Sequence, residues 1–149
     1  MTARLIALKG LIAATDSTFN FEARGFSELL VGKCLMCRRK KVAWEGGTWN
    51  PVLTIEHIES RHHGGDNSVM NLGLACDGCN HRKGRRIDVL RADDPQRQAT
   101  VASLLVERRT RLREPLMDPR LGPLVPRVFA WTEKDPRWMH LEVVWGKKS

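Results

Sequence analysis

The segment that decides the fold runs from Ile55 to Gly84 and reads IEHIESRHHGGDNSVMNLGLACDGCNHRKG. It places Glu56 beside His57, and two asparagines follow at Asn71 and Asn80. Hydrolysis of a phosphodiester bond needs a base for the attacking water and a cation that neutralises charge on the phosphoryl oxygens. Imidazole titrates near neutrality and suits the first task. Carboxylate and amide oxygens are hard ligands that suit Mg²⁺ or Mn²⁺. The segment therefore supplies both a candidate base and a candidate cation site.

The four cysteines of the chain form two C-x-x-C pairs, Cys34 with Cys37 and Cys76 with Cys79. Zinc prefers a tetrahedron of ligands, and a two-residue gap lets one turn supply two thiolates. Since no cysteine is left over, the spacing predicts one structural zinc site. Four thiolates leave no position open for water, so this zinc is not expected to be the catalytic metal. A redox-active thiol pair remains an alternative.

Around this segment the sequence predicts short strands, a loop and a helix. Residues 42–50 favour two strands that turn at Glu45-Gly46-Gly47, and residues 52–55 favour another strand. Residues 59–69 are polar and glycine-containing, which indicates a loop. Residues 71–83 predict a short turn, the second cysteine pair and a helix. The predicted order is strand, strand, loop, helix.

The flanking regions predict mainly helices. Residues 3–15 have apolar residues at helical spacing, and residues 21–31 predict a second short helix that ends near Gly32. Downstream, Asp94-Pro95 predicts a helix start, with aspartate as the cap and proline in the first turn. A terminal strand pair that turns near Asp135-Pro136 is also predicted. The arginines at the end of the downstream helix are interpreted either as surface charge or as an accessory DNA clamp: Arg108, Arg109, Arg111 and Arg113.

The E-H-I strand end, the Gly64-Gly65 loop, the Asn71-Leu72 step and the C-x-x-C-N-x-x-K-G run together resemble the HNH nuclease family. The resemblance covers about residues 33–86, and the flanking cysteine pairs resemble the zinc-bearing branch of that family. It implies an α+β fold with a ββα-metal (His-Me finger) core, a structural zinc, an N-terminal helical arm and a C-terminal helix plus short strands. We expect a single domain over residues 1–149, with an N-terminal arm (1–32), an HNH nuclease core (33–91) and a C-terminal extension (92–149).

The resemblance also implies roles for individual residues in a metal-dependent DNA endonuclease. His57 is expected to be the general base, and Asn71 is expected to orient that base and its loop. Glu56 and Asn80 are expected to hold the catalytic Mg²⁺ or Mn²⁺, which makes this an H-N-N variant. Glu56 occupies a position more often filled by aspartate, and its extra methylene moves the carboxylate by about one bond, which matters where placement is critical. His81 is the alternative to Asn80 as a ligand.

The charge of the chain favours a nucleic-acid partner. The net charge is +8, and basic side chains at phosphates release condensed counterions. We expect DNA as the partner and no membrane, since no apolar run approaches about 18 residues. A monomer would nick one strand and a symmetric homodimer would cut both. The residues expected to contact nucleic acid are His62, His63, Arg82, Lys83, Arg85 and Arg86.

The sequence is compatible with several biological roles and several functions. The chain start lacks the ordered sections of a signal peptide, so a cytoplasmic, intracellular protein is expected. Phage, mobile-element and host-defence roles are all compatible with the residues. The rival functions are a zinc-stabilised nucleic-acid-binding module without hydrolysis, a redox protein, and a nuclease subunit that acts only within a larger phage or defence complex.

Overall fold

The computed structural model of the chain describes residues 3–121 and shows a mixed α+β fold. Among these residues no helix has the length and apolar character needed to cross a membrane. The strand pair predicted near Asp135-Pro136 lies outside the described residues. The helices and strands are, in order, α1 (Ala3–Ala14), β1 (Asn20–Arg24), β2 (Ser27–Lys33), β3 (Lys40–Glu45), β4 (Thr48–Trp49), β5 (Leu53–His57), η1 (Arg61–His63), η2 (Val69–Asn71), β6 (Leu72–Cys76), α2 (Asp77–Lys83), the π-helical turn η3 (Gly84–Asp88), α3 (Pro95–Arg111) and η4 (Pro119–Leu121).

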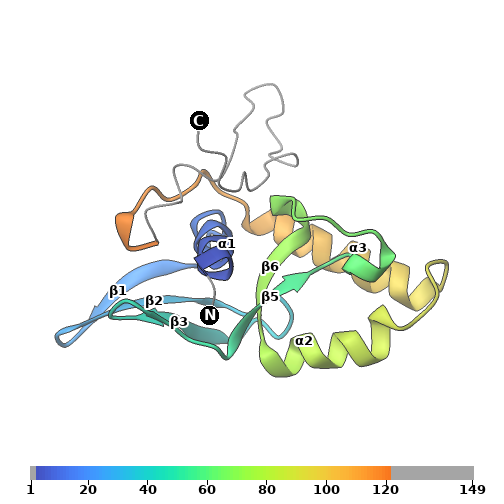
Figure 1. Cartoon of the computed structure of the whole chain (residues 1–149), viewed down its shortest axis with the longest axis horizontal. Coiled ribbons are helices and arrows are strands. Elements are labelled where there is room, and N and C mark those ends of the chain that lie inside the picture. The colour runs from blue at the N-terminus through green and yellow to red at the C-terminus, as the bar shows by residue number, and fades with distance from the viewer. Residues whose placement is uncertain (1–2, 122–149) are drawn as a thin grey trace.

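Strands β1 to β4 form an antiparallel sheet in chain order (Figure 1). The helix predicted over residues 21–31 was wrong, because this stretch forms the β1–β2 hairpin. Gly25 lies at the hairpin turn with φ +63°, a left-handed conformation that glycine adopts without steric cost. Gly32 does not end a helix either, since a Cβ there would lie 2.2 Å from the ring of Phe19. The glycine is therefore needed so that the Phe19 ring can cover the strand.

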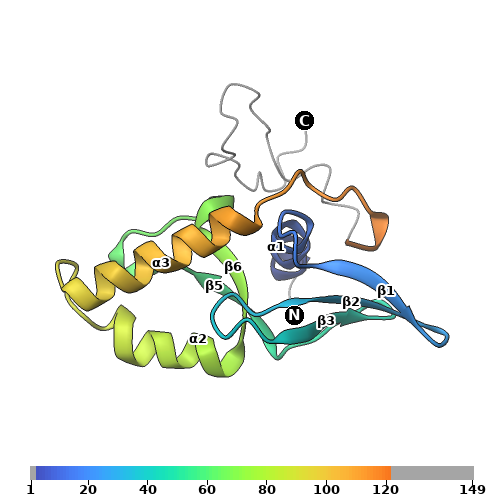
Figure 2. The same cartoon turned by 180° about the vertical axis from the view of Figure 1, so that it is seen from behind.

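Helix α1 is part of the core. Leu11, Ile12, Ala13 and Ala14 are each at most 1% exposed. They belong to one apolar cluster with residues of the sheet and of β5 and β6. In Figures 1 and 2, α1 lies between the sheet and the segment that follows α3. The predicted helix is confirmed, but it is a central element rather than a peripheral arm.

Strands β5 and β6 pair antiparallel, and α2 follows β6 directly, which produces a β-β-α unit. His57 pairs with Leu72, and Glu56 pairs with Gly73. The prediction placed only a turn before the second cysteine pair and so missed β6. Gly73 lies where a Cβ would be 2.6 Å from the side chain of Leu35, so the first cysteine turn packs closely on this strand. The second strand of the unit is thus β6, whereas β3 and β4 belong to the other sheet.

Helix α3 begins as predicted, with the Asp94 side chain accepting hydrogen bonds from the backbone N–H groups of Gln96 and Arg97. Its last turn corrects the sequence interpretation, because Arg108 is completely buried. The guanidinium of Arg108 donates to the carbonyl of Val69, and to the carbonyl and hydroxyl of Thr15. This arginine is neither surface charge nor a DNA clamp.

Two neighbouring arginines act in the same way. Arg111 donates to the carbonyls of Lys33 and Cys34, at 2.7 and 3.1 Å. Arg113 donates to backbone carbonyls around the end of α1, those of Ala13, Ala14 and Phe19. Only Arg109 of the four is exposed. Charged donors to buried carbonyls stabilise a fold by about 1.5–3 kcal/mol each, so these side chains join α3 to α1 and to the first cysteine turn.

We expect Arg108→Met to lower the free energy of unfolding by about 3 kcal/mol, because it removes the charged hydrogen bonds to the carbonyls of Val69 and Thr15 and to the Thr15 hydroxyl. Arg109→Met, at the adjacent exposed position, is the matched control and should change stability by less than about 0.5 kcal/mol. Urea unfolding of the two variants measures the difference. Equal stabilities would contradict the structural role of Arg108.

Candidate functional site

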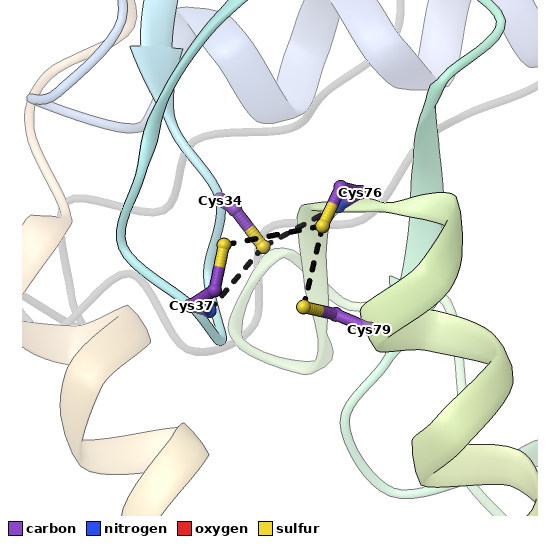
Figure 3. Close-up of side chains that lie close together, drawn as sticks. All are labelled: Cys34, Cys37, Cys76 and Cys79. Atoms are coloured by element: carbon purple, nitrogen blue, oxygen red, sulfur yellow. Dashed lines mark hydrogen bonds between the residues drawn. The ribbon is translucent and has the colours of Figure 1, made fainter.

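The two cysteine pairs meet between the turn after β2 and the start of α2 (Figure 3). Their four sulfurs lie within 4.8 Å of one another, and all four cysteines are free. The Cys37 and Cys76 sulfurs are 3.9 Å apart, and those of Cys76 and Cys79 are 3.2 Å apart. Ligands at about 2.3 Å in a tetrahedron around zinc are about 3.8 Å apart. The cluster is consistent with a structural zinc, and sulfurs from both pairs converge on one point.

Hydrogen bonds to sulfur prepare this cluster for a cation. The Cys34 sulfur accepts from the backbone N–H groups of Met36, Cys37 and Cys76. Burial opposes ionisation of Cys34, but these donors outweigh it and lower the pKa of its thiol to about 7. Burial and the neighbouring thiols raise the pKa of Cys79 to about 12. Without a cation the cluster therefore resists carrying four negative charges, and a bound divalent metal would remove that resistance.

His57 ends strand β5, and its imidazole is partly buried. Its Nε2 lies 2.8 Å from Oδ1 of Asn67. An amide oxygen can only accept, so in this arrangement Nε2 carries the proton and Nδ1 keeps the lone pair. Asn67 thus fixes the tautomer of the imidazole, a role that the sequence interpretation assigned to Asn71.

Asn71 instead braces the loop that follows β5. Its side chain is buried and accepts from the backbone N–H of Glu59 at 2.7 Å. Its amide nitrogen donates to the carbonyls of Glu59 and Asp66. A Cβ at Gly65 would lie 1.7 Å from the carbonyl oxygen of Glu59, so the loop closes tightly here. The Asn71 side chain makes no hydrogen bond to the His57 imidazole in the described structure, but it holds the loop that carries Asn67.

Glu56 points into the protein, where its side chain is 2% exposed. The Lys83 ammonium lies 2.8 Å from its Oε1, 2.7 Å from Oδ1 of Asp88 and 3.2 Å from the carbonyl of His57. Burial raises the pKa of Glu56 to about 7, with Lys83 acting in the opposite direction. Its second oxygen, Oε2, is buried and has no hydrogen-bond partner among the described residues. An unsatisfied buried oxygen costs about 1–3 kcal/mol, and a cation ligand would satisfy it.

Asn80 lies on α2 and faces β5. Its amide nitrogen donates to the hydroxyl of Thr54 at 3.0 Å and to the carbonyl of Ile55 at 3.2 Å. These bonds fix the side chain and leave its Oδ1 as the atom able to bind a cation. Asn80 and Glu56 therefore both lie where α2 crosses β5. A surface hollow of about 390 Å³ is lined by Asp77, Asn80, His81, Gly84 and Arg85.

The residues expected to contact nucleic acid divide into two groups. His62, Arg82, Arg85 and Arg86 are exposed. Lys83 is buried against Glu56 and Asp88, so its ammonium is not on the surface in this structure. His63 is partly buried, and its Nε2 lies 2.9 Å from the carbonyl of Asp88.

Two residues of the site were missed from the sequence. Asn67 lies in a segment that the sequence predicts to be a loop, and the Asp66-Asn67 dipeptide indicates a turn but not a contact with the imidazole. Asp88 lies beyond the motif, at the end of a π-helical turn that no periodicity predicts. It contacts both Lys83 and His63. Both residues contact the predicted site only because the fold brings distant parts of the chain together.

We expect Cys76→Ser to lose bound metal and to lower the melting temperature of the protein strongly, because removal of one thiolate opens the tetrahedron and metal binding contributes to the free energy of folding. Metal content by elemental analysis and thermal unfolding provide the measurement. His57→Ala, which leaves the cluster intact, is the control. A Cys76→Ser protein that keeps its metal and its melting temperature would contradict a structural metal site.

Comparison with known protein families matches residues 34–86 to the family described as HNH endonuclease. Neither the curated proteins nor the solved structures gave a match to the chain. The matched residues begin at the first cysteine of the cluster and contain β3 to β6, α2 and the sulfur cluster. They also contain His57, Asn71 and Asn80. The chain therefore carries an HNH endonuclease domain at residues 34–86.

Proposed function

We propose that the protein is a metal-dependent DNA endonuclease that hydrolyses phosphodiester bonds. The observation that carries this proposal is the oriented imidazole of His57 at the end of β5, beside a buried carboxylate with one unsatisfied oxygen. Both features lie inside the HNH endonuclease domain. A base and a cation site next to one another are the two requirements of this hydrolysis.

His57 is the general base in this proposal. With Nε2 held by Asn67, the lone pair on Nδ1 accepts a proton from the attacking water. Asn71 acts at a distance, because it keeps the loop of Asn67 closed through its bonds to Glu59 and Asp66. The imidazole is therefore positioned by a chain of two asparagines.

Glu56 and Asn80 are the residues that would hold a catalytic Mg²⁺ or Mn²⁺. They offer one carboxylate oxygen and one amide oxygen, the hard donors that these ions prefer. When bound, such an ion neutralises the charge that develops on the phosphate oxygens. His81 is exposed and lines the same hollow as Asn80, so it remains the alternative ligand. The zinc held by the cysteines has a structural role in this scheme, since four thiolates fill its coordination.

The substrate is bound through exposed cations around α2. Arg85 and Arg86 are exposed and have no ion pair with an acidic side chain in the described part of the chain, so they are available to phosphates. Arg82 is also exposed, and it donates one hydrogen bond to the Cys79 sulfur. Arg85 lines the hollow beside Asn80. The net charge of +8 also favours binding of a nucleic acid. A monomer would nick the duplex, whereas a symmetric homodimer would cut both strands.

The second candidate is a zinc-stabilised binding module without hydrolysis. The observation that favours it is the burial of Glu56 under Lys83, which closes the carboxylate to solvent in this conformation. Such a module would bind DNA through the same arginines. DNA binding alone does not require the hydrogen bond between His57 and Asn67, so this bond argues against the second candidate. An activity assay separates the two candidates.

We expect wild-type protein with Mg²⁺ or Mn²⁺ to nick or linearise supercoiled plasmid, and His57→Ala to be slower by about 10²–10⁴-fold because it lacks the base. Metal content and melting temperature of His57→Ala should match those of wild type. A His57→Ala protein that cuts at the wild-type rate would exclude His57 as the base. Binding without cleavage by the wild type would favour the binding module.

The pKa of Glu56 predicts a pH dependence of Mn²⁺ binding. A proton and the cation compete for this carboxylate, and the pKa of Glu56 is raised to about 7. Protonation below that pH weakens binding, so the affinity should fall about tenfold from pH 8 to pH 6. Titration calorimetry on His57→Ala should give the same dependence, since this variant keeps Glu56. Affinity that is flat between pH 6 and pH 8 would argue against Glu56 as a ligand.

A further inference from the structure

The Lys83 ammonium is saturated by three oxygen atoms. It has three protons, and its three neighbours are Oε1 of Glu56 at 2.8 Å, Oδ1 of Asp88 at 2.7 Å and the carbonyl of His57 at 3.2 Å. The Lys83 side chain is only 3% exposed, so water offers little competition for these bonds. The two carboxylates therefore share one ammonium cation.

This sharing has a consequence for Glu56. Only its Oε1 is occupied by the ammonium, while Oε2 is buried with no partner in the described part of the chain. Charges attract strongly where water is excluded. Without the charge of Asp88, the nearest anion left to Lys83 is Glu56, and the ammonium would move over both of its oxygens. Asp88 thus competes with Glu56 for the Lys83 ammonium.

Asp88 is well placed for this role. Its side chain is 21% exposed and lies at the end of the π-helical turn η3, outside the residues that match the family. Its backbone carbonyl, not its carboxylate, lies 2.9 Å from Nε2 of His63. A change of the side chain alone therefore leaves the contact with His63 in place.

We propose that Asp88 is a positioning residue for the catalytic cation: by sharing the ammonium of Lys83, it leaves one oxygen of Glu56 free for that cation. The inference rests on the proposed function, because it requires Glu56 to be a ligand. It extends the site beyond the family match to a residue that does not touch the cation itself. Residues behind metal ligands commonly change metal affinity by about 10–100-fold.

The test measures Mn²⁺ binding to the full-length, zinc-loaded protein by electron paramagnetic resonance, with zinc content and melting temperature as further readouts. Asp88→Asn should weaken Mn²⁺ binding about tenfold while zinc content stays at the wild-type level. Asp88→Glu, which keeps the charge, should recover most of the affinity. Asp93→Asn is the matched control, because the Asp93 side chain is 77% exposed and, among the described residues, forms an ion pair with Arg91 alone.

Two results would overturn the proposal: Mn²⁺ binding to Asp88→Asn that equals that of the wild type, or loss of zinc from this variant, which would make Asp88 a merely structural residue. Glu56→Gln distinguishes this failure from failure of the proposed function. If Glu56→Gln loses Mn²⁺ binding and Asp88→Asn does not, only the inference about Asp88 fails. If Glu56→Gln binds Mn²⁺ like the wild type, the cation site assigned to Glu56 fails and the inference fails with it.

Discussion

The convergence of four sulfurs is the constraint on which the rest of the site depends. It joins the turn after β2 to the junction of β6 and α2, two segments that are distant in sequence. The backbone N–H of Leu35 donates to the carbonyl of Leu74, so the first turn also extends the edge of β6. Asn80 follows Cys79 directly in α2. Any shift of the sulfur cluster would consequently move Asn80 relative to Thr54 and Glu56, the residues around the proposed cation site.

A second set of contacts, made by arginines at the end of α3, stabilises the segments around this junction. The guanidinium of Arg111 donates to the carbonyls of Lys33 and Cys34, and that of Arg108 to the carbonyls of Thr15 and Val69. A backbone carbonyl has two lone pairs, and these guanidinium groups give the buried carbonyls a second, charged donor. Arginine suits this task because it has five donors in a rigid plane. Helix α3 thereby supplies hydrogen bonds to the segments that follow α1 and β2 and to η2.

The sequence predicted those features whose chemistry is local. The cysteine spacing predicted the sulfur cluster, Asp94-Pro95 predicted the start of α3, and the glycine pair predicted the β3–β4 turn. It did not predict the β1–β2 hairpin, because Glu28-Leu29-Leu30 suits a helix as well as a strand and only pairing decides between them. It also placed Lys83 and Arg108 on the surface. Their burial depends on Glu56 and on the Thr15 and Val69 carbonyls, partners that lie far away in the sequence.

The buried arginines show that the residues matched by the family are fewer than the residues that pack together as one folded unit. The family match stops at Arg86, yet the carbonyls of Val69 and Cys34 each accept a further, charged hydrogen bond from an arginine of α3. Leu72 and Leu74 of β6 pack in one cluster with residues of α1, which precedes the match. An excised segment of residues 34–86 would keep the four cysteines and His57 but would expose this apolar surface to water. The segment that matches the family is thus smaller than the unit that packs together, and designs that transplant it must carry both flanks.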